Sequence, residues 1–192
     1  MTANSEKECL IEMFRESGAH LEGHFRLTSG RHSANYLQCA LLLRFPVYAE
    51  FAGQALARRL EPLKPEVVVS PAIGGLIIGH EVARSLGVPF LFCEREEGKM
   101  RLRRFPHPGP VPFVVVEDVI TTGGSSCEVG RVIEEGGARW VGTGAIVNRS
   151  GGSHCLPDPI HALWDVLFET WEPENCPLCA EGLPYMKPGS RI

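Results

Sequence analysis

The sequence lacks the features that mark membrane, secreted and nucleic-acid-binding proteins. No apolar run approaches about 18 residues, so we expect no segment to span a bilayer. The stretch from Thr2 to Glu16 is polar and acidic, without the apolar region of a signal peptide, and we expect none. The net charge of −4 gives no electrostatic basis for binding nucleic acid or a membrane surface.

The cysteines do not form the even set of a disulfide framework. There are seven, and Cys39, Cys93 and Cys127 lie in segments that are predicted to belong to the core. An odd number of scattered thiols is typical of reduced cysteines in a cytoplasmic protein. The length of 192 residues, without repeats or low-complexity segments, favours one α/β domain over residues 1–192.

The most informative stretch runs from Phe113 to Ser126. A valine-rich strand leads into the adjacent carboxylates Glu117 and Asp118, and a Thr/Gly/Ser loop then opens a helix expected over 127–135. Such a loop presents backbone N–H groups at a helix N-terminus, which is an anion site, and carboxylates accept hydrogen bonds from sugar hydroxyls. The combination indicates a site for a ribose 5-phosphate.

A simpler interpretation of this stretch is a strand–turn–helix connection capped by Thr or Ser. A cap uses one such residue and needs no pair of carboxylates, so we favour the phosphate site. The loop lacks the G-x-x-x-x-G-K-[ST] spacing of an NTPase P-loop, which argues against ATP hydrolysis.

The rest of the chain alternates between predicted helices and strands. Helices are expected over residues 5–17, over residues 46–60 and from the loop 71–75 to residue 86. Strands are expected over residues 66–70, 89–93, 111–117 and 140–147. This order predicts an α/β fold with a doubly wound, mostly parallel sheet, whose ligands bind beyond the carboxyl ends of the strands. The turning segment Gly23–Ser33 and a strand at 35–40 predict a small N-terminal β hood, built from residues 20–40 or so plus C-terminal tail segments.

A long charged segment, Glu94–Phe105, separates two of the predicted strands. Its five basic residues stand out in an acidic chain. A solvated hairpin is the plain interpretation, but a loop of this length inside a compact domain is usually functional. We therefore favour a mobile loop whose Arg and Lys side chains close over a pyrophosphate.

With these segments in place, the chain resembles the orotate phosphoribosyltransferase family, essentially from end to end. The strand, acidic pair and loop resemble the phosphoribosyl-diphosphate (PRPP) motif of type I phosphoribosyltransferases. The further matching segments are Phe25–Ser33, Ser70–Gly75, Arg95–Arg101, Asn148–Ser150 and Cys176–Cys179. The PRPP motif alone leaves the base open, whereas the Ser29–Ser33 segment and Arg149 favour orotate.

The resemblance implies a type I phosphoribosyltransferase-like fold and a reaction in pyrimidine biosynthesis. Ribose 5-phosphate would pass from PRPP to N1 of orotate, forming orotidine 5′-monophosphate and pyrophosphate. Mg²⁺ would bind through PRPP, near Glu117 and Asp118, without a direct protein ligand. The resemblance also implies a homodimer in which the loop 95–105 is shared across the interface.

The resemblance further implies a role for each matching residue. The residues that would hold the 5′-phosphate are Thr121, Thr122, Gly123, Gly124 and Ser125, and those facing the ribose hydroxyls are Glu117 and Asp118. Pyrophosphate would meet the backbone of Ala72, Gly74 and Gly75 and the side chains of Arg95, Lys99 and Arg101. Lys99 is the best candidate for neutralising the leaving group. Orotate would bind Arg149 through its carboxylate and would stack near Tyr36 and Leu37.

Three positions depart from some family members. Thr28 and Gly74 stand where some members have lysine, and Glu96 stands at a position that is basic in some. With these departures, binding of the pyrophosphate would depend more on Arg95, Lys99 and Arg101 of the basic segment. The individual contacts with PRPP stay open.

Two other functions stay open at this point. The first is a phosphoribosyltransferase for another nucleobase, against which Arg149 argues. The second is a PRPP-sensing regulator without catalysis, and the sequence lacks the added DNA-binding element and basic face that such a regulator would need.

The Cys176–Cys179 pair has zinc-like spacing, and His154–Cys155 is a candidate second half. Because structural zinc needs four ligands, we favour a packed turn in the tail over a metal site. The histidines show no triad spacing, and His32 is the one worth testing.

Overall fold

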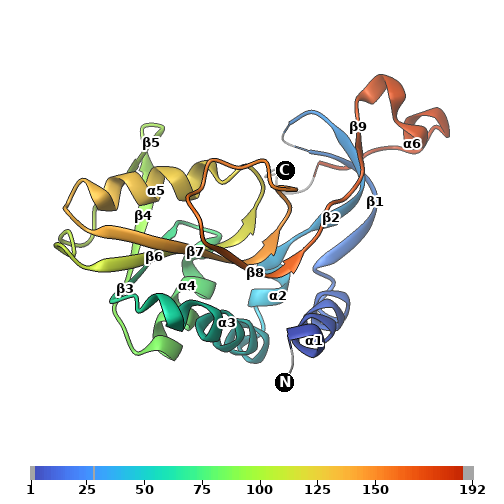
Figure 1. The fold of residues 1–192 in the computed structure, drawn as a ribbon. Coiled ribbons are helices and arrows are strands. Elements are labelled where there is room, and N and C mark those ends of the chain that lie inside the picture. The colour runs from blue at the N-terminus through green and yellow to red at the C-terminus, as the bar shows by residue number, and fades with distance from the viewer. Residues whose placement is uncertain (1–2, 28, 188–192) are drawn as a thin grey trace.

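The computed structural model describes residues 3–27 and 29–187, arranged around two β-sheets (Figure 1). The larger sheet has six strands in the order β5-β4-β3-β6-β7-β8; β5 is antiparallel to β4 and the other neighbours are parallel. Its strands are β3 (Val67–Pro71), β4 (Phe90–Glu96), β5 (Lys99–Arg101), β6 (Pro112–Ile120), β7 (Arg139–Asn148) and β8 (Ile160–Asp165). The smaller, antiparallel sheet contains β1 (His20–Arg26), β2 (His32–Leu37) and β9 (Thr170–Trp171).

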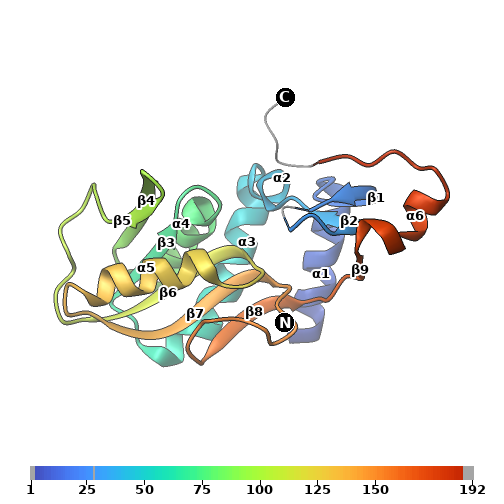
Figure 2. The same cartoon turned by 90° about the horizontal axis from the view of Figure 1, so that it is seen from above.

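Helices cover both faces of the larger sheet (Figures 1 and 2). One face packs against α5 (Gly124–Glu134), and the other against α3 (Pro46–Leu60) and α4 (Gly75–Leu86). The other helical elements are α1 (Ala3–Glu16), α2 (Cys39–Leu43), α6 (Pro177–Ala180), η1 (Glu61–Leu63) and η2 (Pro173–Asn175). The predicted doubly wound α/β fold with a separate β hood is confirmed.

The valine run in β6 follows from burial on both faces. Val114 and Val116 belong to the apolar cluster that includes α3 and α4, whereas Phe113 and Val115 belong to the cluster that includes α5. Because successive side chains of a strand point to opposite faces, a strand covered on both sides carries a continuous apolar run. This burial fixes β6, and with it the acidic pair that follows the run.

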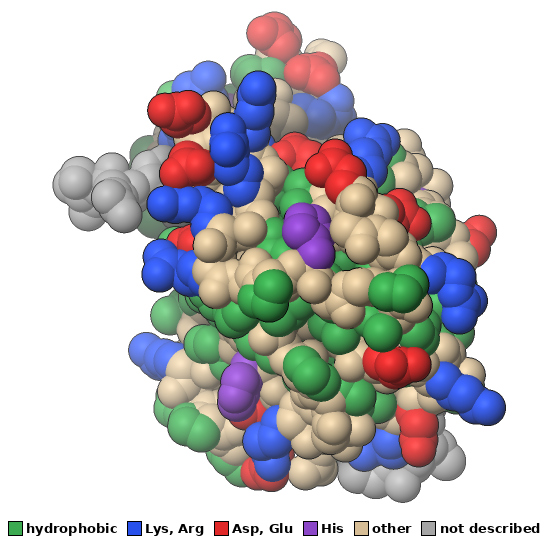
Figure 3. All heavy atoms as spheres, turned by 90° about the vertical axis from the view of Figure 1, so that its left-hand side faces the viewer, with side chains coloured by type: hydrophobic (Ala, Val, Ile, Leu, Met, Phe, Trp, Pro, Cys, Tyr) green, Lys and Arg blue, Asp and Glu red, His purple; other side chains and the backbone are tan. Residues whose placement is uncertain are grey.

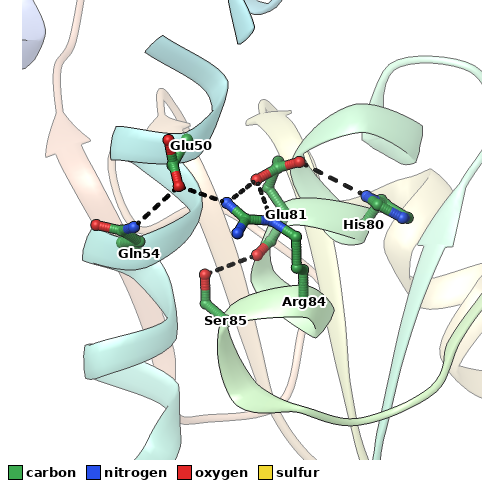
Figure 4. Close-up of polar contacts among 6 residues, drawn as sticks. All are labelled: Glu50, Gln54, His80, Glu81, Arg84 and Ser85. Atoms are coloured by element: carbon green, nitrogen blue, oxygen red, sulfur yellow. Dashed lines mark hydrogen bonds and ion pairs between the residues drawn. The ribbon is translucent and has the colours of Figure 1, made fainter. Parts of the chain in front are cut away.

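The helices α3 and α4 pack closely, which positions the loop that precedes α4. An added Cβ at Gly53 of α3 would lie 2.5 Å from the Cβ of Glu81, so a larger residue would force the helices apart. Arg84 of α4 donates to Glu81 at 2.7 Å and to Glu50 of α3 at 3.0 Å (Figure 4). These partly exposed ion pairs contribute at most about 1 kcal/mol, so close apolar packing holds the pair of helices together.

The hood is tied to the C-terminal part of the chain. Arg31 donates to the hydroxyl of Thr170 at 2.9 Å and to its carbonyl at 2.7 Å, and it forms an ion pair with Glu172. The Ser33 hydroxyl donates to the carbonyl of Glu169 at 3.0 Å. The segment from Ser29 to Ser33 therefore binds the region of β9 in this structure.

Two predicted strand ends were wrong, and some elements were not predicted. The strand expected at 35–40 ends at Leu37 and gives way to α2, because Cys39, Leu42 and Leu43 are buried at helical spacing. The strand expected to end at Glu117 continues to Ile120, since it keeps its pairing with β7. The edge strand β8 was not predicted, because its residues show no clear alternation and it pairs only with β7 in the described sheet.

Among the described residues, we find no helix with the length and apolar character needed to cross a membrane.

Candidate active site

The acidic pair lies near the end of β6, just before the turn into α5. Gly123 caps the helix with a φ of +76°, and an added Cβ there would lie 2.6 Å from Cγ of Leu156. Glycine therefore suits both the left-handed backbone and the available space. The turn leaves the first N–H groups of α5 without intrahelical partners, as at any helix N-terminus, so they are available to an anion.

A cavity of about 290 Å³ opens at this turn, and we call it the phosphate cavity after its predicted ligand. Its lining residues are Arg95, Glu117, Val119, Thr121, Thr122, Gly123, Gly124, Ser125 and Glu128. The structure thus brings together all five predicted phosphate residues, one of the two carboxylates and one of the predicted pyrophosphate cations.

Glu117 is a half-buried carboxyl whose surroundings favour its neutral form. Burial raises the pKa of Glu117 to about 7; the hydrogen bond from Ser126 lowers it, and the charge of Asp118 adds to the rise. The Ser126 hydroxyl donates to Oε2 of Glu117 at 2.5 Å. Glu117 is therefore partly protonated near neutral pH, and a bound cation or hydrogen-bond donor would favour its ionised form.

Asp118 faces the loop between β3 and α4. An added Cβ at Gly74 would lie 2.7 Å from Oδ1 of Asp118, so glycine lets this loop approach the carboxylate and a lysine would not fit this arrangement. Burial raises the pKa of Asp118, and the Val119 N–H, which donates to Oδ1 at 2.9 Å, opposes the rise. The N–H of Ala72 donates to the carbonyl of Cys93 at 2.8 Å and is engaged in the sheet.

Part of the basic segment forms a β-hairpin. β4 and β5 pair around Glu97 and Gly98, which both have positive φ, as the tight turn of such a hairpin requires. Arg95 donates to the carbonyl of Gly98 at 2.8 Å and forms an ion pair with Glu128 of α5 at 3.0 Å. This contact anchors the hairpin beside the phosphate cavity.

Most cations of the basic segment Glu94–Phe105 are already paired with acids. Arg101 and Arg103 form ion pairs with Glu96 at 3.5 and 3.1 Å, and Arg104 forms one with Glu94 at 2.7 Å. Lys99 is exposed, and within the described part of the chain it has no ion pair. Lys99 is therefore the hairpin cation that is free to bind an incoming anion.

A second polar group lies at the carboxyl end of β7. The guanidinium carbon of Arg149 lies 5.2 Å from the ring centre of Phe168, and its buried Nε has no hydrogen-bond partner among the described residues. Burial lowers the pKa of Arg149. Burial raises the pKa of nearby Tyr36, and the positive charge of Arg149 lowers that pKa. A buried guanidinium nitrogen without a partner is rare and indicates a group that a ligand completes. Leu37, next to Tyr36, is buried.

Curated relatives match this chain over nearly its whole length. It is 51% identical to orotate phosphoribosyltransferase of Desulforamulus reducens, over 96% of this chain and 97% of the relative. It is 49% identical to orotate phosphoribosyltransferase of Carboxydothermus hydrogenoformans, over 95% of this chain and 97% of the relative. The chain belongs to the orotate phosphoribosyltransferase family. No protein-family model matches it.

Solved structures agree with membership of the orotate phosphoribosyltransferase family. Orotate phosphoribosyltransferase from Aeropyrum pernix aligns with a TM-score of 0.70 and 26% identity, over 82% of this chain and 93% of that one. Adenine phosphoribosyltransferase from Thermoanaerobacter pseudethanolicus aligns with a TM-score of 0.54 and 16% identity, over 69% of this chain and 88% of that one. The second likeness shows a shared fold and nothing about the base.

Several residues of this orotate phosphoribosyltransferase site were not predicted from sequence. Ser126 hydrogen-bonds Glu117, Glu128 holds Arg95, and Phe168 lies under Arg149. Ser126 and Glu128 lie on α5 within the first turn after the PRPP motif, so extending the predicted site along the helix could have found them. No feature of the sequence around Phe168 indicated that it belongs to the site. The family departure at Thr28 lies outside the described residues.

The Cys176–Cys179 pair also differs from expectation. The proposed second half, His154–Cys155, lies instead beside the phosphate loop, where the Cys155 N–H donates to the carbonyl of Thr122 at 3.2 Å. The groups that the structure brings to the cysteine pair are His24 and His32 of the hood.

Proposed function

We propose that this orotate phosphoribosyltransferase transfers the ribose 5-phosphate of PRPP to N1 of orotate. The C1–O bond to pyrophosphate breaks, the C1–N1 bond forms, and the N1 proton is released, giving orotidine 5′-monophosphate. The observation that carries the proposal is the cavity in which Glu117 lies beside the phosphate loop and the N-terminus of α5. We infer that the chain acts as a single domain in the cytoplasm, in agreement with its seven free cysteines.

The phosphate loop would hold the 5′-phosphate and the acidic pair would hold the ribose. The Thr and Ser hydroxyls and the free N–H groups at the start of α5 are donors suited to a phosphate dianion. Glu117 and Asp118 would accept hydrogen bonds from the 2′ and 3′ hydroxyls. Because burial raises the pKa of Glu117 to about 7, a bound cation or hydrogen-bond donor would favour loss of its proton; burial also raises the pKa of Asp118.

The loop before α4 would hold the pyrophosphate end of PRPP. Gly74 and Gly75 carry no side chain that would separate their backbone from the ligand, and Gly74 already abuts Asp118. Since the Ala72 N–H is engaged by Cys93, its contribution would come from shaping the loop. The oxygens of PRPP, a hard donor set, would hold Mg²⁺ near Glu117 and Asp118 without a direct protein ligand, and the ion would stabilise charge on the diphosphate.

Cations from the hairpin would stabilise the departing pyrophosphate. Arg95 lines the cavity, and Lys99 is exposed and free of an ion pair in the described chain. Arg101 would need to leave Glu96, whose ion pair at 3.5 Å is long and exposed. Such surface pairs contribute at most about 1 kcal/mol, so binding a diphosphate would readily displace them.

We also infer a homodimer in which residues 95–105 reach the neighbouring site. Exposed apolar side chains support this inference: Ile73 is 82% exposed and Ile77 is 46% exposed, both near the start of α4, and Val47 of α3 is 65% exposed. Figure 3 shows a face with hydrophobic side chains across its middle and charged side chains nearer its margin. Apolar patches rimmed by charge are typical of interaction surfaces.

Orotate would bind between the hood and the end of β7. Arg149 offers a buried guanidinium nitrogen that lacks a partner in the described structure, and a carboxylate is the group that a guanidinium binds with two parallel hydrogen bonds. Tyr36 and Leu37 would pack on the pyrimidine ring.

The direct test measures the fall in orotate absorbance on adding PRPP and Mg²⁺, with adenine, hypoxanthine and uracil assayed separately by product. We expect turnover of orotate and of none of the other bases, and we expect this turnover to be lost without Mg²⁺. Turnover of another base instead would overturn the assignment of Arg149. PRPP binding without turnover of any base would favour a PRPP-sensing regulator.

The shared loop has its own test. Mixing an inactive Lys99→Ala protomer with an inactive Asp118→Ala protomer is expected to restore partial activity, because one of the two sites in each mixed dimer then has both groups. Verified heterodimers without activity would show that Lys99 acts within its own chain.

A further inference from the structure

Four potential metal ligands meet where the hood contacts the C-terminal tail. They are His24 of β1, His32 of β2, Cys176 before α6 and Cys179 within α6, and their ligand atoms all lie within 4.8 Å of one another. His24, His32 and Cys176 are buried. We propose that this Cys₂His₂ cluster is a structural zinc site.

The spacing of the four atoms is close to that of a tetrahedral zinc site. With Zn–N of 2.0–2.1 Å and Zn–S of 2.3 Å, tetrahedral geometry requires about 3.4 Å between nitrogens and about 3.6 Å between nitrogen and sulfur. Cys179 Sγ lies 3.3 Å from Nδ1 of His32 and 3.8 Å from Nε2 of His24. Cys176 Sγ lies 3.5 Å from Nε2 of His24, and the two nitrogens lie 2.8 Å apart. A small outward movement of the two rings would give an ion its full coordination.

His24 is held in the orientation that metal binding needs. Its Nδ1 lies 2.8 Å from the carbonyl of Leu183. A carbonyl can only accept, so Nδ1 carries the proton and Nε2 presents its lone pair to the cluster. Backbone carbonyls that fix the second nitrogen in this way are typical of zinc-bound histidines.

The backbone also presents the two cysteines together. Cys176 caps α6, and its carbonyl accepts the N–H of Ala180 at 3.1 Å. The helix ends with the N–H of Gly182 donating to the carbonyl of Cys179 at 3.0 Å, and Gly182 has a φ of +72°. This single tight turn directs both thiols toward the hood, as Cys-x-x-Cys turns do in zinc sites.

A metal explains the cluster better than the alternatives. A Cys176–Cys179 disulfide would remove both sulfur ligands and leave two buried histidines facing each other at 2.8 Å. Hydrogen bonds alone would join the two cysteines to the histidines through weak S–H donors. Soft thiolates and imidazole together favour zinc over magnesium or calcium. Because the protein supplies all four ligands, no coordination position remains for a substrate, and the role is structural.

The proposed ion would fix the tail on the hood. The tail already pairs with β1: the N–H of Arg26 donates to the carbonyl of Met186, and the N–H of Met186 donates to the carbonyl of His24, each at 2.8 Å. β2 carries His32 at its first residue and Tyr36 four residues later, so the ion would support the strand that presents Tyr36 about 13 Å away.

The test uses the full chain, produced in zinc-supplemented medium and purified without chelators. Elemental analysis is expected to find one zinc per chain, and cobalt(II) exchange is expected to give a tetrahedral d–d spectrum with a thiolate charge-transfer band. Both signals should be lost in Cys176→Ser and Cys179→Ser and kept in the matched control Cys9→Ser, whose cysteine lies on α1.

Chelation of the wild-type protein gives a readout that does not require a variant to fold. Removal of zinc with a strong chelator should free one ion per chain and lower the thermal midpoint, and added zinc should restore it. Zinc-free protein that is fully folded with reduced thiols would overturn the proposal. So would a Cys176–Cys179 disulfide found by mass spectrometry, or zinc retained by both cysteine variants.

Discussion

The phosphate cavity and the Cys/His cluster are two polar sites built in opposite ways. The cavity takes most of its residues from one continuous stretch, Glu117 to Glu128. The cluster joins Cys179 to His32 and His24 across 147 and 155 residues of sequence. A site of the first kind can be read along the chain, whereas one of the second kind becomes visible only after the chain has folded.

The two sites also differ in what should depend on them. The cavity lies at the carboxyl ends of parallel strands, where substrates bind in this class of fold. The cluster joins the hood to the tail and offers no open coordination position. Substitutions in the cavity should therefore change activity, and substitutions in the cluster should change stability.

The largest expected effect is at Asp118. We expect Asp118→Asn to lower kcat/KM roughly 10²–10³-fold, the loss typical when a group that stabilises the transition state is removed. Steady-state kinetics measure the loss, and Asp158→Asn, an exposed aspartate in the loop before β8, serves as the control. An equal loss in Cys179→Ser would break the distinction between the two sites.

A smaller effect is expected at Gly123. We expect Gly123→Ala to weaken PRPP binding at least tenfold, because the new Cβ meets Leu156 and shifts the loop. Gly137→Ala is the matched control, since Gly137 also has positive φ, +87°, but an added Cβ meets nothing within 4 Å. Both variants should lose about 1–2 kcal/mol of stability from the left-handed backbone.

Calorimetric titration with PRPP and Mg²⁺ separates the two glycine variants. If both bind PRPP equally weakly, backbone strain alone explains the loss and the close contact with Leu156 does not define the site.

The third expected effect is a pH dependence from Glu117. Its pKa is about 7 in the folded chain and 4.5 in the absence of the fold, so the folded state binds the extra proton between these values. This carboxyl therefore contributes less to stability as pH rises from 4.5 to 7, and its contribution is constant above that range. Glu117→Gln should remove this slope from denaturation midpoints measured across pH.

The same carboxyl should make activity rise with pH over the range in which its contribution to stability falls. In its proposed role, ionised Glu117 would accept hydrogen bonds from ribose hydroxyls, so kcat/KM for PRPP should rise with pH through about 7. In Ser126→Ala the midpoint should move upward, because the hydrogen bond from Ser126 lowers the pKa of Glu117. Ser85→Ala, a hydroxyl on α4 away from the cavity, should leave the midpoint unchanged. A midpoint that stays fixed in Ser126→Ala would assign the titration to another group.

The smallest expected effect is that of the proposed zinc on PRPP binding. Removing the ion should lower the thermal midpoint yet change the dissociation constant for PRPP by no more than about twofold, as expected for regions that share no partners. A tenfold change would show that the hood and the cavity are coupled.

The sequence identified the cavity well because its residues follow one another. The valine run, the acidic pair and the Thr/Gly/Ser loop predict a strand, a turn and a helix, and this order places the loop at a helix N-terminus. Lys99 and Arg149 were predicted through family resemblance, and the structure adds that Lys99 is exposed and that Nε of Arg149 is buried.

Other features could not be predicted because they depend on contacts between distant segments. The segment Glu94–Phe105 was interpreted as a mobile loop in preference to a solvated hairpin, and the structure adds a tight turn in residues 94–101 and an ion pair between Arg95 and Glu128. The pair Cys176–Cys179 was interpreted as a packed turn, because nothing nearby in sequence supplied the missing ligands. His24 and His32 reach it only through the pairing of β1 with β2 and the docking of the tail.

The sequence by itself determined the α/β class, the mostly parallel character of the sheet and the loop before α5, since hydrophobic periodicity and glycine positions act over a few residues. Tertiary structure alone decided which groups meet: Gly74 against Asp118, Phe168 under Arg149, and two histidines beside two cysteines. The physical reason is that side-chain contacts between distant segments depend on how sheets and helices pack, and local sequence does not encode that packing.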